Sequence, residues 1–201
     1  MLSLSGVKYG IIPRMAKKKQ QWQKKDLRLK DDHTWKAPEG YKLVVLDRGA
    51  VSFNIPQEWF VARHEPFEMH DGEPPDDNAR LSVSFWRLQV GVDWSGLPQV
   101  EMLASATRPD RNDLLEQGDI QTIPRDDLEV VWVQQRFLDP QEKREAYTRI
   151  TVARGQGVQV LITFDYWVDD AEKFVPVWQE VIRSLQLGRV IADPTQGETL
   201  H

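Results

Sequence analysis

The sequence predicts one α+β domain, an antiparallel β-sheet with flanking helices in an α/β/α sandwich. Between residues 41 and 168, short stretches alternate apolar and polar residues, the pattern of a strand with one face in the core. Near the end of the chain, residues 174–185 carry apolar side chains at helical spacing. We expect the domain to span 41–188, a length that buries roughly 68–70% of its unfolded surface and needs no disulfide or metal to fold.

The first elements expected are two strands within residues 41–56, joined by a turn at 47–49. The second strand reads as half-buried because apolar and polar residues alternate along it (Val51, Ser52, Phe53, Asn54 and Ile55). Pro56 has no N–H and therefore ends this strand. Trp59 is then expected to fold back over the open edge of the core.

The middle of the chain predicts a loop, a strand and a helix. Residues 61–79 hold three prolines, one glycine and six acids, so we expect a long loop that is either functional or mobile. An alternating strand follows at 80–90. A helix begins near Pro98, and a further helical turn is expected within 112–119.

The last part predicts three strands and a closing helix. The strands are expected at 128–138, 145–154 and 157–168, the last two joined by a tight turn. The helix is expected to start after Asp170 and to end at Gly188, with a kink or a late start because of Pro176. Residues 189–201 are expected to form a flexible tail.

Two stretches resemble the PsbP-like superfamily. The strand at 49–59 matches the first core strand of that family at five positions (Gly49, Phe53, Ile55, Pro56 and Trp59), and Ser184-Leu185 matches the end of its last helix. Members include lumenal photosystem subunits and assembly factors, a nuclear-transport GTPase binder and secretion-related chaperones. The resemblance, over roughly 41–188, implies a PsbP-like fold and a non-catalytic protein-binding or assembly/chaperone-like module.

Charge is distributed unevenly along the 201 residues, whose net charge is −5. Residues 1–30 carry a net charge of +8, and residues 31–201 carry −13. We expect residues 1–40 to be a disordered basic arm around Trp22, and nucleic acid or anionic lipid to bind only there, since an acidic body repels both. Met15 begins a stretch that resembles an ordinary bacterial start, so either Met1 or Met15 begins the protein.

Several classes of chemistry are excluded or disfavoured. There is no cysteine, which rules out disulfides, thiolate nucleophiles and Cys-based metal clusters. No G-x-S-x-G elbow is present, and Gly155-Gln156-Gly157 lies between strands instead of before a helix. No stretch approaches the ~20 apolar residues of a membrane span. We therefore expect a cytoplasmic protein that is not an enzyme and uses no cofactor.

A rival hypothesis rests on the acidic loop. His64, Glu68 and His70 combine imidazole and carboxylate groups, which suit a divalent metal, and would support a metal-dependent enzyme. Their spacing matches no known ligand motif, and a solvated loop is the alternative explanation.

The eight tryptophans offer a second candidate site. Trp59, Trp132 and Trp178 are expected in the core. The candidates for a binding surface are Trp86 and Trp167, on strand faces opposite the apolar rows, Trp94 in a loop, and Trp22 in the arm. Exposed tryptophans are enriched where proteins dock, although helices covering the second face would also explain the two strand positions.

Overall fold

The computed structural model describes residues 37–62, 66–94, 96–107, 113–193 and 198–200. Most of the expected basic arm lies outside this range. The helices and strands, in chain order, are β1 (Tyr41–Leu46), η1 (Asp47–Gly49), β2 (Val51–Pro56), β3 (Phe60–Ala62), β4 (Phe67–His70), β5 (Ala79–Arg87), α1 (Gln99–Ala106), β6 (Leu114–Gln117), β7 (Gln121–Ile123), β8 (Glu129–Leu138), β9 (Glu145–Gly155), β10 (Val158–Trp167), η2 (Val168–Asp170), α2 (Ala171–Ser184), β11 (Gln186–Leu187), β12 (Val190–Asp193) and β13 (Glu198–Leu200).

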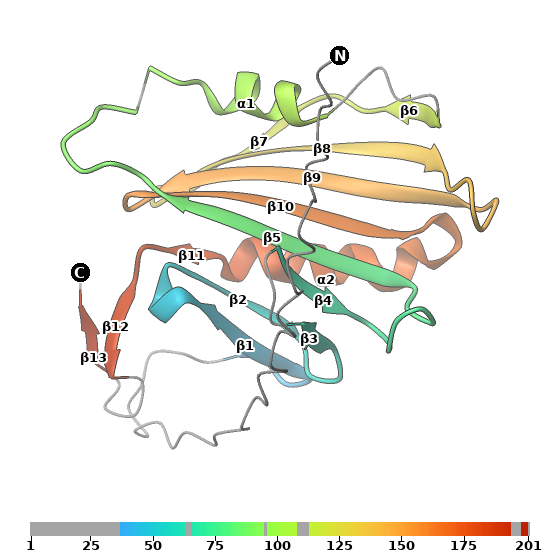
Figure 1. Ribbon diagram of the computed structural model, residues 1–201, viewed down its shortest axis with the longest axis horizontal. Helices are drawn as coiled ribbons and strands as arrows, with labels where there is room; N and C mark the ends of the chain where they lie inside the picture. Colours follow the sequence, from blue (N-terminus) through green and yellow to red (C-terminus); the bar gives the residue numbers. More distant parts are fainter. Residues whose placement is uncertain (1–36, 63–65, 95, 108–112, 194–197, 201) are drawn as a thin grey trace, which may run out of the picture.

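Antiparallel sheets dominate the described part of the chain (Figure 1). The large sheet runs β3-β4-β5-β10-β9-β8-β6, and β7 also pairs with β8. We expected the first hairpin, β1–β2, to belong to this sheet, and that expectation is wrong. The hairpin forms a separate small sheet with β11, which pairs with β2 in antiparallel register.

The large sheet has two unlike faces, called here the core face and the α1 face. On the core face, inward rows of β5 and β10 pack against α2 and the small sheet (Leu81, Val83, Val160, Ile162 and Phe164). On the α1 face, Leu103 packs on Val131, Val133, Ile150 and Val152. The two helices thus lie on opposite faces, as predicted, but the small sheet makes the fold richer in strands than the expected α/β/α sandwich.

Strand β2 is buried on both sides, not half-buried. Ser52 and Asn54 are as inaccessible as their apolar neighbours. The backbone N–H of Asn54 donates to Ser184 Oγ at 2.8 Å, and its side-chain amide donates to Glu180 Oε1 at 2.8 Å. These bonds to α2 satisfy polar groups that would otherwise be costly to bury.

Trp59 lies where it was expected. After Pro56 the chain turns, with the Trp59 N–H donating to the Pro56 carbonyl at 3.2 Å. The indole is almost fully buried and contacts the rings of Phe164 and Phe174, with centroids 5.9 and 6.3 Å away. It therefore closes the core between β10 and α2.

Three local expectations are wrong. The expected loop at 61–79 contains the hairpin β3–β4, in which Met69 faces the core. The expected helical turn at 112–119 is instead the strand β6, paired with β8. Helix α2 ends at Ser184 and continues through Pro176, so Gly188 does not cap it but follows β11.

The C-terminal part of the described chain contains a short two-stranded sheet. Residues 190–200 contain the antiparallel pair β12–β13, and flexibility of the tail stays a prediction. Neither helix in the described ranges has the length and apolar character needed to cross a membrane.

Candidate functional site

Exposed apolar side chains are concentrated in one stretch of the chain, from the end of β5 to the first turn of α1. Of nine large hydrophobic residues exposed in the described part of the chain, five lie within residues 86–100: Trp86 (53% exposed), Val90 (97%), Val92 (44%), Leu97 (48%) and Val100 (45%). We call these five residues the β5–α1 surface. Contiguous exposed apolar surface marks docking sites, so the stretch that holds most of the exposed apolar side chains is the candidate for one.

The backbone beneath this surface is anchored by a buried arginine. Arg154, on the α1 face of β9, donates to the carbonyl oxygens of Trp94 and Leu97, the latter at 3.1 Å. Both of these bonds come from Nη1, and Nη2 donates to Glu129 Oε2 at 2.6 Å. Trp94 adds a hydrogen bond from its indole N–H to the Gln89 carbonyl at 3.3 Å. The connection from β5 to α1 is therefore tied to the sheet while its apolar side chains stay exposed.

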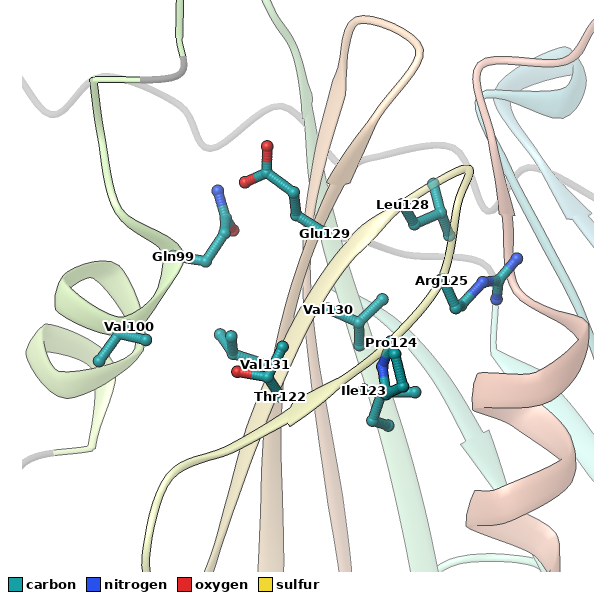
Figure 2. A pocket seen from close by; sticks show the side chains of 10 residues that line it. All are labelled: Gln99, Val100, Thr122, Ile123, Pro124, Arg125, Leu128, Glu129, Val130 and Val131. Atoms are coloured by element: carbon teal, nitrogen blue, oxygen red, sulfur yellow. The ribbon is translucent and has the colours of Figure 1, made fainter.

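An apolar groove of about 300 Å³ adjoins the β5–α1 surface. Figure 2 shows Gln99 and Val100 of α1 on one side of it and Thr122 to Pro124, in and after β7, on the other. Val100 belongs to both the groove and the exposed surface. Next to Val100 in sequence, Gln99 is buried with its side-chain amide against that of Gln159, whose Nε2 lies 2.9 Å from Gln99 Oε1.

The structure brings together two of the four predicted tryptophans. Trp86 lies opposite Gln159 at the start of β10, Gln159 lies opposite Arg154 of β9, and Arg154 donates to the carbonyl of Trp94. Trp167 lies eight residues further along β10, roughly 26 Å away at ~3.3 Å per residue. Its ring is half-buried under the guanidinium of Arg144, 4.5 Å from the centroid. Trp22 lies outside the described residues.

The candidate metal ligands are only partly described. His64 lies outside the described residues. His70 is buried in β4, with Nδ1 2.8 Å from Asp77 Oδ2 and Nε2 3.8 Å from Glu68 Oε2. Within the described ranges, no three His, Asp or Glu side chains are grouped in a way that could hold a metal ion.

A second buried arginine was not singled out by the sequence analysis. Arg149, on the core face of β9, has its guanidinium over the rings of Trp178 (4.6 Å to the centroid), Trp132 (5.1 Å) and Tyr166 (5.9 Å). Its Nε donates to Gln134 Oε1 at 2.8 Å. Burial holds the pKa of Arg149 below its usual value. The sequence did hold a signal for the burial of Arg149, because this residue occupies an inward position of the alternating pattern of β9.

The described fold is PsbP-like. The cyanobacterial PsbP (CyanoP) of Synechocystis sp. PCC 6803 superimposes with a TM-score of 0.51 at 10% identity, over 75% of this chain and 94% of that one. A crystal structure from Bacteroides thetaiotaomicron VPI-5482 gives 0.52 at 11% identity, over 74% of this chain and 48% of that one. At such low identity these likenesses define the fold and no function.

The family is defined by sequence. The Alr1449 family model matches residues 42–191, and the chain belongs to that family. Among its relatives is the "Uncharacterized protein alr1449" of Nostoc sp. (strain PCC 7120 / SAG 25.82 / UTEX 2576), 45% identical over 188 residues, which cover 91% of this chain and 97% of that protein.

Proposed function

We propose that this protein is a non-catalytic protein-binding module, of an assembly or chaperone-like kind, whose partner docks on the β5–α1 surface. The observation that carries the proposal is that five of the nine exposed apolar side chains in the described part of the chain lie in the one stretch that Arg154 anchors. Binding an apolar partner there removes this surface from water without reordering the connection beneath it.

The groove between α1 and β7 would extend the same contact. Val100 joins the two, so a partner could cover Trp86 and place a side chain in the groove. Trp167 is too far along β10 to belong to this surface. The basic arm, with Trp22, would add salt-sensitive attraction from a distance and little specificity.

Affinity capture tests this proposal. The bait is the full chain, as wild type, as Trp86→Ala and as Phe60→Ala, a matched control in β3 that is 52% exposed. The expected result is one protein retained by wild type and Phe60→Ala and lost by Trp86→Ala. A chain starting at Asp31 should retain it too, with weaker capture only at low salt.

Two results would contradict this proposal. Recovery of nucleic acid or lipid alone, dependent on residues 1–30, would show that the folded domain is not the binding module. Stoichiometric metal in protein purified without a His tag, lost on His64→Ala, would instead favour the metal-dependent enzyme.

A further inference from the structure

Arg149 is a buried cation whose described partners are all neutral. The residue keeps only 8% of its surface exposed. The rings of Trp132, Trp178 and Tyr166 surround its guanidinium, and Gln134 accepts from its Nε. Among the described residues, no carboxylate forms an ion pair with it. A buried charge is normally paired with an opposite charge, so this arrangement calls for an explanation.

Two further buried donors belong to the same region of the core face. The Trp178 indole N–H and the Thr151 hydroxyl have no hydrogen-bond partner among the described residues. Trp178 contacts Trp132 with ring centroids 4.4 Å apart, and Thr151 lies opposite Trp132 in the β8–β9 register. We call Arg149, Trp132, Trp178, Tyr166 and Thr151 the Arg149 cluster. It contains more donor capacity than acceptor capacity.

The cluster lies at the margin of the core and not at its centre. Strand β8 is the second strand from the β6 edge of the large sheet. The small sheet, β1-β2-β11, forms no strand pairing with it. Trp132, Gln134 and Tyr147, which border Arg149, are each partly exposed. The guanidinium is therefore screened by aromatic rings but still bordered by solvent-accessible side chains.

From this geometry we infer a carboxylate-binding site at the Arg149 cluster, between β8 and α2. A carboxylate is planar and pairs with a guanidinium through two parallel hydrogen bonds, and it supplies the acceptors that the cluster lacks. A single cation suits a carboxylate better than a phosphate, whose larger charge needs more donors. Burial without a neutralising partner is also what lowers the pKa of Arg149 from its usual value.

The site differs from the β5–α1 surface, which lies on the other face of the sheet. Arg149 and Arg154 are on one strand, but their side chains face opposite ways. Loss of one site therefore does not imply loss of the other, and the two proposals can fail separately.

Titration of the full chain with N-acetylalanine and N-acetylalaninamide tests the inference, since these probes differ only in the carboxylate. The readout is the NMR shift of the tryptophan indole N–H signals, assigned with Trp132→Phe and Trp178→Phe, at ionic strength held constant with NaCl. The acid should shift the signals of Trp132 and Trp178 saturably, and the amide should not. A peptide with both ends blocked, whose one carboxylate is an aspartate side chain, is titrated in the same way. Tighter binding of this peptide than of N-acetylalanine would indicate an aspartate of a polypeptide as the ligand, and weaker binding would indicate a terminal or free carboxylic acid.

Variants complete the test. Arg149→Lys keeps the charge but not the paired donors, and should raise the Kd for the acid by about tenfold or more. Arg136 of β8 lies on the core face, as Arg149 does, but outside the cluster, so Arg136→Gln should leave the Kd unchanged. Equal responses to acid and amide, or an unchanged Kd in Arg149→Lys, would overturn the inference. Since the acid and amide are compared on wild-type protein, that result does not depend on a variant that folds.

Discussion

Strand β9 carries two arginines that are equally buried, at 8% exposed each, and the two faces of the sheet treat them differently. On the α1 face, Arg154 is paired with Glu129 and with two backbone carbonyls, so its charge holds a chain segment in place. On the core face, Arg149 is surrounded by rings and neutral acceptors. The first arrangement stabilises the fold, whereas the second leaves binding capacity unused.

The largest loss of stability is expected on substitution of Trp178, on the core face. Its side chain is 6% exposed and packs against Trp132 at the centre of the helix stripe. Trp178→Ala should lower the free energy of unfolding by roughly 3–5 kcal/mol, through lost burial and the cavity left behind. Urea unfolding measures this, with Trp86→Ala as the control, expected within about 0.5 kcal/mol of wild type. A small loss for Trp178→Ala would mean that α2 is not docked on the core face.

A smaller effect separates the two arginines. Arg154→Met leaves two backbone carbonyls without their donor and should cost about 1–3 kcal/mol. Arg149→Met replaces an unpaired buried charge with an apolar side chain and should stay within about 1 kcal/mol of wild type, or stabilise the protein. The same urea experiment checks both. Greater destabilisation by Arg149→Met than by Arg154→Met would show that the Arg149 cluster is structural.

A pH dependence is expected where α2 meets the small sheet. The hydrogen bond from Arg183, helped by one from Asn54, holds the pKa of Glu180 below its usual value. A lowered pKa in the folded state gives stability that is present above the usual pKa and lost as pH falls through the lowered one. Wild type should therefore be more stable than Glu180→Gln at pH 7, and this difference should shrink as pH falls through the lowered pKa of Glu180. A difference that grows on acidification would contradict this.

The strands after residue 128 were predictable because each carries a long alternating pattern of its own, as β8, β9 and β10 do. The small sheet was not, since β11 has two residues and pairs with β2 across most of the chain. The hairpin β3–β4 was missed because prolines and acids flank strands of three and four residues, too short to reveal a period. Local alternation of apolar and polar residues is enough to predict a strand. Which strands share a sheet depends on pairing between distant segments, which alternation does not reveal.

The site was predictable in the same measure. Alternation placed Trp86 and Trp167 on the face opposite the apolar row, and the registers confirm that face for both. Alternation could not give the distance between these tryptophans, nor the hydrogen bonds from Arg154 to the carbonyls of Trp94 and Leu97. Arg149 was missed because a charged residue at an inward position looks like a break in the pattern.

The most direct test of the β5–α1 surface is site-specific photo-crosslinking. Val90 is almost fully exposed and Leu115, in β6, is 53% exposed, so either position accepts a photoreactive residue without disturbing the core. Both chains are irradiated in lysate, each with and without Trp86→Ala. We expect one protein crosslinked from position 90, absent with Trp86→Ala, and no crosslink to that protein from position 115. The same protein crosslinked equally from both positions, or from position 90 despite Trp86→Ala, would contradict a docking site on the β5–α1 surface.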